Sequence, residues 1–483
     1  MIAAGAALRA ALDRARDRPL LLGEDGVRHT GGTLDAAVDA LAGALATQGL
    51  TGARIGLWAW NSAPALEAHL AVERLGGTRV PVDPSAPLEE ARAVFAAAGV
   101  AAVVTDAEHA GRLSLPTLVH DEGAPLRADR APEAVEAEPD RTALLYPRMA
   151  AGGTLLAVPL SYANWEATMA LNCRYYTSGV YGPPVGPDDR YLTVQQLMHG
   201  TGLLGTFPFL YLGLPQVILR RFAPEAVVAT LLRHAITTTF FVPGMITRVV
   251  GALDADRRGD LPLRRLLYGG APMPREDLLA ALRRLGPVLA QVYGRFEGGW
   301  PLACLDQADH RAILAGDAAR AASCGRPVPG SELAIRPVPG REDGVGELRV
   351  RGPMVVREYA DPDGWCALGD LASRGEGGYL RLHGRLDGMI NTGSYHVYPA
   401  EVEEAIRTLL PVRAVRVVGE ADPVWGQAVT AYVVPEEGQD LPDAASLRER
   451  LATRLARYKL PRRVEVVAQL PTINALATGD VSI

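Results

Sequence analysis

Three short segments of the sequence combine glycine with side chains that could hold a ligand: Tyr268-Gly269-Gly270-Ala271, Tyr293-Gly294-Arg295-Phe296-Glu297 and Gly369-Asp370. Glycine lets the backbone approach a ligand closely because it carries no side chain. A carboxylate accepts hydrogen bonds and can bind a metal ion. The alternative is that the glycine pair marks a turn, that Gly-Asp marks a strand end, and that Glu297 is a solvated surface residue.

The chain contains one lysine, Lys459, so a mechanism that needs a lysine elsewhere is excluded. Its four cysteines are too widely scattered for a zinc knuckle or a Cys-x-x-Cys pair, and we expect reduced thiols in the core. These are Cys173, Cys304, Cys324 and Cys366. The net charge is −6, and no basic run is interleaved with aromatic residues, so a nucleic-acid partner is not expected.

Length and composition indicate a globular protein with a large domain and a smaller one. The chain has 483 residues, of which 48% are hydrophobic and 22% charged, with a mean hydropathy of +0.07. No stretch approaches the ~18–20 apolar residues that cross a bilayer. Residues 1–20 mix alanine and leucine with arginine and aspartate, which differs from the apolar core of a secretory signal. We therefore expect a soluble, cytoplasmic protein without a membrane partner.

The elements that must position these residues alternate between helix and strand, which indicates a parallel sheet covered by helices. The pattern predicts a helix over residues 34–50, a strand over 53–60, a helix over 63–77 and a strand over 78–83. It recurs over residues 97–105 and 224–243. The bulk of the chain is therefore expected to be layered α/β.

The pattern of predicted secondary structure changes twice towards the C-terminus. Residues 330–356 predict short alternating strands in a β-rich region on the flank of the large domain. A compact unit follows residue 385, with helices predicted over 400–410 and 444–458 and strands over 412–419, 427–435 and 462–470. We place the boundary there, giving a large domain at 1–386 and a small domain at 387–483.

Several blocks in this order and spacing resemble the adenylate-forming superfamily of acyl- and aryl-CoA synthetases, peptide-synthetase adenylation domains and luciferases. The blocks are residues 291–299, 323–330, 346–359, 364–372, 384–406, 417–434 and 458–471. The resemblance implies a layered α/β N-terminal domain with a flanking β subdomain and a small, mobile α+β C-terminal domain. It also implies that a carboxylic acid attacks ATP to give an acyl adenylate, whose acyl group passes to a nucleophile after the small domain rotates.

The resemblance implies a nucleotide site in the three glycine-containing segments. Gly269, Gly270 and Ala271 match the loop beside the adenine, and Tyr293-Gly294 matches the segment with the aromatic face. Asp370 matches the aspartate that accepts hydrogen bonds from the ribose hydroxyls, and Arg385 matches its partner. Nucleotide or nucleotide-like binding is therefore expected.

The resemblance also implies catalytic and substrate residues. Glu297 matches the magnesium-associated glutamate, and His199 matches a histidine near the carboxylate of the bound acid. Gly202, Phe241 and Met245 fall in segments that line the acyl pocket. A lone histidine on an apolar segment is otherwise most often a satisfied core residue.

Three segments depart from the family pattern. The family's phosphate-binding loop corresponds to residues 148–157, where only Arg148, Gly153 and Thr154 could still bind phosphate. The favoured interpretation of this segment is a Gly-Gly turn that joins two packed segments. Phe296 replaces a phosphate-bonding threonine, which weakens the predicted magnesium site. Asp480 aligns with the catalytic lysine of the C-terminal segment. Loss of one such charge-stabilising group costs on the order of 10²- to 10³-fold in rate.

The segment implied for acyl transfer is better preserved. Asp387 matches the hinge of the small domain, and residues 391–396 resemble the glycine loop that approaches the substrate during thioester formation, with Asn391 in place of a lysine. Candidates for a substitute cation are Arg148, Arg462 and Arg463.

Three hypotheses follow. The first is an acyl- or aryl-acid ligase of specialised metabolism with an altered mechanism, using ATP or its AMP moiety with magnesium, and CoA or a carrier-protein phosphopantetheine as acceptor. The second is an enzyme that performs only the transfer from a preformed adenylate or thioester. The third is a non-catalytic scaffold for a biosynthetic partner. The acid substrate is predicted to be apolar or aromatic.

Overall fold

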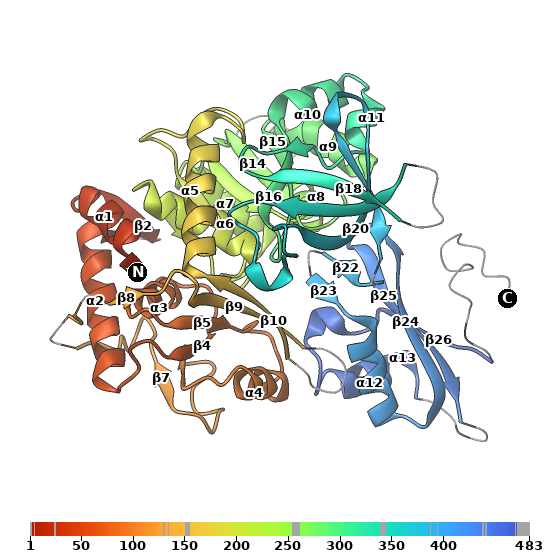
Figure 1. The fold of residues 1–483 in the computed structure, drawn as a ribbon, viewed down its shortest axis with the longest axis horizontal. Coiled ribbons are helices and arrows are strands. Elements are labelled where there is room, and N and C mark those ends of the chain that lie inside the picture. The colour runs from red at the N-terminus through yellow and green to blue at the C-terminus, as the bar shows by residue number, and fades with distance from the viewer. Residues whose placement is uncertain are drawn as a thin grey trace.

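The computed structural model describes residues 2–3, 5–23, 26–128, 131–133, 135–149, 155–253, 261–338, 344–386, 388–393, 395–436, 439, 442–468 and 470, without the side chains of residues 2, 3, 148, 149, 155, 156 and 400. Within these ranges the chain forms a large N-terminal domain and a smaller C-terminal domain (Figure 1). This arrangement confirms the predicted α/β fold with a flanking β region and a small α+β domain.

The first sheet of the large domain has the order β10-β9-β5-β4-β6-β7. Its strands are β4 (Arg54–Trp58), β5 (Thr78–Pro81), β6 (Ala102–Thr105), β7 (Thr117–Val119), β9 (Thr142–Met149) and β10 (Leu155–Ser161). The strands from β9 to β7 along this order are parallel, and β10 is antiparallel to β9. A short pair, β1 (Ile2–Ala3) and β8 (Glu136–Ala137), lies outside this sheet.

The second sheet has the order β17-β16-β15-β14-β13-β11-β12-β2-β3. Its strands are β2 (Pro19–Gly23), β3 (Gly26–Thr30), β11 (Tyr191–Thr193), β12 (Gln216–Ile218), β13 (Thr238–Phe241), β14 (Arg265–Gly269), β15 (Leu289–Arg295), β16 (Gly299–Leu305) and β17 (Arg326–Pro327). The segment 224–243 behaves as predicted, since α7 (Pro224–Arg233) leads into β13. The central strands are parallel, so loops at their carboxyl ends can form one site.

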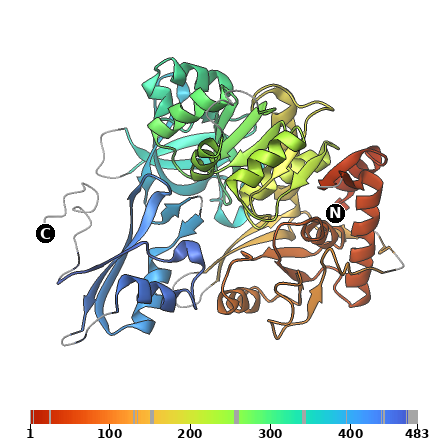
Figure 2. The same cartoon turned by 180° about the vertical axis from the view of Figure 1, so that it is seen from behind.

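Of the two remaining sheets, one forms the flanking β region and the other belongs to the small domain. The flanking sheet is β18 (Glu332–Pro337), β19 (Gly346–Arg351), β20 (Cys366–Arg374) and β21 (Leu380–Arg385). The small domain holds β22 (Ile390–Thr392), β23 (Tyr395–Val397), β24 (Val412–Asp422), β25 (Gly426–Pro435) and β26 (Arg463–Val466). Figures 1 and 2 both show the small domain in blue, below the flanking sheet and beside β9 and β10.

Helices cover these sheets. Those of the large domain are α1 (Ala6–Arg14), α2 (Gly31–Thr47), α3 (Ala63–Arg74), α4 (Leu88–Ala97), α5 (Tyr162–Ser178), α6 (Gly200–Tyr211), α7, α8 (Pro243–Gly251), α9 (Arg275–Leu285), α10 (Gln307–Leu314) and α11 (Ala318–Ala321). Those of the small domain are α12 (Pro399–Leu409) and α13 (Ala444–Leu451). None of the helices in the described ranges is long and apolar enough to cross a membrane.

Local sequence explains where the long α5 helix starts and stops. The hydroxyl of Ser161 accepts a hydrogen bond from the backbone N–H of Asn164, and the Asn164 side chain accepts one from the N–H of Ser161. This capping box satisfies donors that the first turn leaves free. The helix ends at Gly179, whose φ of 86° is left-handed and easy for glycine. The helix then packs Trp165 under the buried guanidinium of Arg79, 4.1 Å from the ring centroid.

One predicted element is wrong in its extent. The helix predicted over 444–458 ends at Leu451, and a short 3-10 turn, η4 (Arg457–Lys459), follows it. The backbone N–H of Ala456 is instead bound by the carboxylate of Glu90, which lies in the large domain. A tertiary contact therefore replaces the last helical turns that the sequence pattern favoured.

Candidate active site

Asp370 lies between two side chains, Arg385 and Tyr293, that the sequence analysis assigned to the same nucleotide site. Strands β20 and β21 set Asp370 opposite Arg385, whose Nη1 donates to Asp370 Oδ1 at 2.8 Å. From β15, the Tyr293 hydroxyl donates to Asp370 Oδ2 at 2.6 Å. Burial and the neighbouring Asp370 raise the pKa of Tyr293, so its hydroxyl remains a donor. Each carboxylate oxygen keeps a second lone pair, and Asp370 can therefore still accept ligand hydroxyls.

The glycine loop after β14 is packed so tightly that it tolerates no side chain. A Cβ on Gly269 would lie 2.1 Å from the carbonyl oxygen of Val292. Gly270 has a left-handed φ of +82°, and its carbonyl accepts a hydrogen bond from Asn391 Nδ2 at 2.6 Å. Ala271 follows in the same loop. The small domain, through Asn391, therefore touches the backbone of the predicted adenine loop.

Glu297 lies at the turn between β15 and β16 and is buried. Its Oε1 is 3.4 Å from Nη2 of Arg295, so an arginine already supplies positive charge there. No group of three or more histidine, cysteine or acidic residues that could hold a metal occurs in the described part of the chain. The described residues therefore offer no metal site made of protein ligands alone, and magnesium binding at Glu297, which substrate phosphates would have to complete, stays a prediction.

Phe296 occupies the position where the family pattern has threonine. Its ring stacks on Tyr146, with centroids 3.7 Å apart and planes at 16°, and its edge meets Trp300 at 4.7 Å. The chain approaches it closely at Gly200, where a Cβ would lie 2.9 Å from the ring. Phe296 is thus part of the packed wall beside Gly294 and cannot donate a hydrogen bond to phosphate.

His199 immediately precedes α6 and faces both domains. Its Nδ1 shares a hydrogen bond of 3.0 Å with the Tyr146 hydroxyl, and the ring of Tyr395 from the small domain meets it edge-on at 4.6 Å. Burial lowers the pKa of His199 to about 4, so the imidazole is neutral at pH 7. Its Nε2 is buried and has no hydrogen-bond partner in the described structure. A buried unsatisfied nitrogen is unusual and marks a position where a ligand could bind.

The other predicted pocket residues, Gly202, Phe241 and Met245, are closely packed in the large domain. Gly202 lies in α6, where a Cβ would be 2.2 Å from the carbonyl oxygen of Gln196. Phe241 is fully buried in the core, and Met245 accepts a hydrogen bond at its sulfur from Gln195 Nε2 at 2.8 Å. An acyl pocket at Phe241 and Met245 stays a prediction.

A cleft lies between the two domains beside His199, with about 570 Å³ of empty space that includes open solvent. We call it the interdomain cleft. The large domain lines it with Val82, Asp83, Glu90, Val94, Tyr146, Pro147, Met198 and His199. The small domain lines it with Tyr395, His396, Tyr398, Glu401, Tyr458 and Lys459. Among these positions, the sequence analysis assigned a role in the site only to His199 and the segment 391–396, and it noted Lys459 only as the chain's one lysine.

The chain's one lysine joins the two domains. Lys459 Nζ is 2.6 Å from Oε1 of Glu90 in α4 and 2.7 Å from Oε1 of Glu401 in α12. Lys459 is only 4% exposed. We call these three residues the lysine triad. Nothing in the sequence pairs Glu90 with Lys459, because 369 positions separate them.

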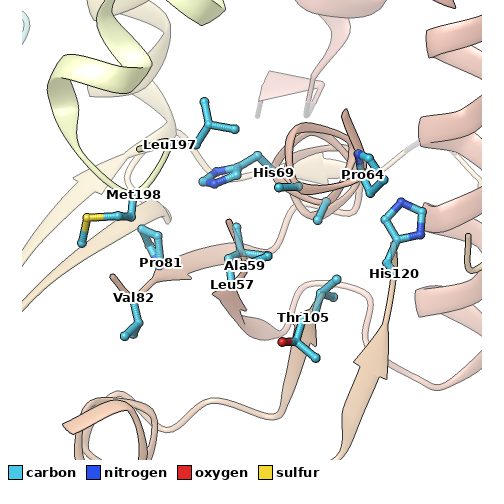
Figure 3. Close-up of a pocket in the computed structure, with 13 residues that line it drawn as sticks. Leu57, Ala59, Pro64, His69, Pro81, Val82, Thr105, His120, Leu197 and Met198 are labelled. Carbon is cyan, nitrogen blue, oxygen red and sulfur yellow. The ribbon is translucent and has the colours of Figure 1, made fainter. Parts of the chain in front are cut away.

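A smaller chamber adjoins the interdomain cleft, since both are lined by Val82 and Met198. Figure 3 shows apolar side chains around it, with His69 on one wall and His120 on another. His69 is buried, and burial followed by the charge of Arg79 lowers its pKa to about 3. The chamber is therefore apolar and uncharged on the His69 side.

Several predicted residues lie outside the part of the chain that the structure describes. Gly153, Thr154, Asp387 and Asp480 lie outside the described residues, as does the side chain of Arg148. The other two candidate cations are engaged within the small domain. Arg462 lies over the ring of Trp425 at 4.3 Å, and Arg463 pairs with Glu420 at 2.9 Å.

The sequence matches the family of AMP-binding enzymes over residues 8–360 and the AMP-binding enzyme C-terminal domain over residues 401–475. The chain belongs to the AMP-binding enzyme family. This membership confirms the predicted adenylate-forming superfamily and its acid-ligase-like class. Of the nucleotide cluster, Tyr293 lies within the first match, whereas Asp370 and Arg385 lie between the two matches.

Relatives of this AMP-binding enzyme include acyl- and aryl-CoA ligases. It is 31% identical to a feruloyl-CoA synthase of an Amycolatopsis species, covering 93% of each chain. It is 28% identical to a medium/long-chain-fatty-acid–CoA ligase of Mycobacterium tuberculosis, covering 97% of this chain and 87% of that one. The amide bond synthetase McbA from Marinactinospora thermotolerans has a similar structure, with a TM-score of 0.82, 29% identity and 97% of each chain covered.

Proposed function

We propose that this protein transfers an acyl group from an acyl adenylate to a nucleophile, as an acid-ligase-like enzyme whose transfer half-reaction is the better preserved. The observation that carries the proposal is the docking of the ribbon β22–β23 on the site. Tyr395 of this ribbon packs on His199, and Asn391 binds the carbonyl of Gly270. In the family that this ribbon resembles, the corresponding loop approaches the substrate during transfer.

The lysine triad supports the same proposal, because it holds the small domain in this arrangement through a buried contact with α4. The nucleotide part of the adenylate would bind at Asp370, with Tyr293 and Arg385 fixing the carboxylate and the loop 269–271 close to the adenine. The packed ring of Phe296 and the degenerate loop at 148–157 argue against strong binding of a triphosphate.

The relatives named above include CoA ligases and an amide bond synthetase, so the family alone does not determine the acceptor. Another relative is a fatty acid–[acyl-carrier-protein] ligase from Streptomyces coeruleorubidus, 32% identical over 54% of this chain. A small carboxylic acid is the common substrate class that these names imply for the acyl group.

Calorimetric titration tests the proposal. We expect a non-hydrolysable acyl-adenylate mimic to bind at least tenfold more tightly than ATP with magnesium, and Asp370→Asn to weaken mimic binding. We also expect a synthetic acyl adenylate to be consumed without ATP. Tight ATP binding with acid-dependent pyrophosphate release would instead show a complete ligase, and binding of neither nucleotide would favour the scaffold hypothesis.

A further inference from the structure

The interdomain cleft contains a buried carboxylate with a free oxygen. Asp83 is only 6% exposed, and its Oδ1 accepts hydrogen bonds from the backbone N–H and the hydroxyl of Ser85, at 2.7 and 2.6 Å. Its Oδ2 has no partner among the described residues. A carboxylate oxygen that lines a cleft and has no donor from the protein can accept a hydrogen bond from a ligand or pair with a cation. The cleft therefore offers a position for a ligand that donates hydrogen bonds.

Aromatic rings form the walls around this carboxylate. In the small domain, Tyr395 and Tyr458 stack on each other with centroids 4.2 Å apart. In the large domain, the hydroxyl of Tyr146 shares a hydrogen bond with His199. Asp83 and these three tyrosines all line the cleft. Tyrosine faces attract cations, most strongly where water is excluded. Carboxylate and ring faces together select a cation with apolar substituents.

Among the described side chains that line the cleft, acidic groups outnumber lysine and arginine. Asp83, Glu90 and Glu401 line it, and the one lysine, Lys459, is already held by the two glutamates. His199 adds no charge at pH 7, since burial lowers its pKa to about 4. An anionic nucleophile such as a thiolate would meet repulsion from Asp83, whereas a cation would be attracted.

We propose that the nucleophile admitted by the interdomain cleft is an amine, bound as its ammonium ion between Asp83 and the tyrosine rings. The inference rests on the proposed function, because the amine is the acceptor for the acyl group. The product would be an amide.

The transfer balances in protons and bonds. The ammonium ion gives one proton to Asp83 Oδ2, from which it reaches water at the open mouth of the cleft. The nitrogen lone pair then forms a C–N bond to the acyl carbon, and the C–O bond to the phosphate breaks with its electron pair leaving on AMP. The second proton passes to Nε2 of His199, in the tautomer whose Nδ1–H donates to the Tyr146 hydroxyl. The products are the amide, AMP and two protons.

Binding of simple ammonium ions tests the inference on the full-length protein. We would titrate benzylammonium and butylammonium against their neutral analogues benzyl alcohol and 1-butanol, and against CoA. At least one ammonium ion is expected to bind about tenfold or more tightly than its alcohol, and Asp83→Asn is expected to remove that preference. Ser85→Ala is the matched control, because it removes a partner of Asp83 and keeps the negative charge.

The outcomes separate this inference from the proposed function. Equal affinity for ammonium and alcohol, absence of binding by both ammonium ions, tighter binding of CoA, or an unchanged preference in Asp83→Asn would overturn the amine. An unchanged melting temperature and unchanged binding of the acyl-adenylate mimic in Asp83→Asn show that the variant is folded. The proposed function is tested by a different titration, because it would be refuted if the unmodified protein failed to bind that mimic.

Discussion

At the scale of single residues, Phe296 shows how a departure from the family pattern has been absorbed into the packing. The ring fills the space between Tyr146 and Trp300, and Gly200 makes room for it. Restoring the family's threonine would therefore remove packing as well as supply a hydroxyl. The position cannot be returned to a phosphate contact by one substitution.

We expect Phe296→Thr to lower the free energy of unfolding by about 2–3 kcal/mol, because a half-buried ring is lost and a cavity remains. ATP binding should not improve. Thermal unfolding and calorimetry measure the two effects, with Phe296→Tyr as a control that keeps the stacked ring. A stable Phe296→Thr protein that binds ATP more tightly would show that the ring alone blocks the phosphate site.

At the scale of elements, the resemblance to the family pointed to the residues of the nucleotide cluster, whereas nothing in the sequence predicted the contacts between the domains. Tyr293 and Asp370 lie in segments that match the family, and only β20, around Asp370, shows a regular alternation of buried and less buried positions. Glu90 and Asp83 carry no such signal, because their importance comes from residues hundreds of positions away. The same contacts explain why the predicted 444–458 helix is shorter, since η4 turns to present Lys459 to α4.

We expect Lys459→Met to weaken docking of the small domain strongly. Removing the ammonium leaves two carboxylates buried without a cation, which costs about 3–5 kcal/mol in comparable buried pairs. Limited proteolysis should then cut the chain between β21 and β22 faster than in the unmodified protein. Arg457→Met, an exposed position in the same turn, is the control and should leave the cleavage rate unchanged. Equal rates for all three proteins would mean that the triad does not hold the domains.

At the scale of the whole molecule, buried neutral histidines couple stability to pH. Folding lowers the pKa of His69 from 6.5 to about 3, so below pH 6.5 the unfolded chain binds a proton that the folded chain does not. Stability therefore falls as the pH drops from about 6.5 towards 3. His199, with its pKa lowered to about 4, acts in the same direction.

Between pH 7 and pH 5, we expect the free energy of unfolding of the unmodified protein to fall by about 2 kcal/mol more than that of His69→Leu. The leucine variant lacks one of the groups that bind a proton on unfolding. Urea unfolding at pH 8, 7, 6 and 5 measures the difference. Plots of the free energy of unfolding against pH for the two proteins should run in parallel between pH 8 and pH 7, where His69 is mainly neutral in both the folded and the unfolded chain. Parallel curves down to pH 5 would mean that His69 stays accessible to protons in the folded protein.

The burial of Lys459 has a practical consequence for observing domain motion. An amine-selective acylating reagent finds one side chain in the whole protein, apart from the α-amino group at the chain start, and that side chain is 4% exposed. Modification of Lys459 requires separation from both glutamates. The rate of its covalent labelling therefore reports how often the two domains come apart, without any introduced probe and with the native sequence.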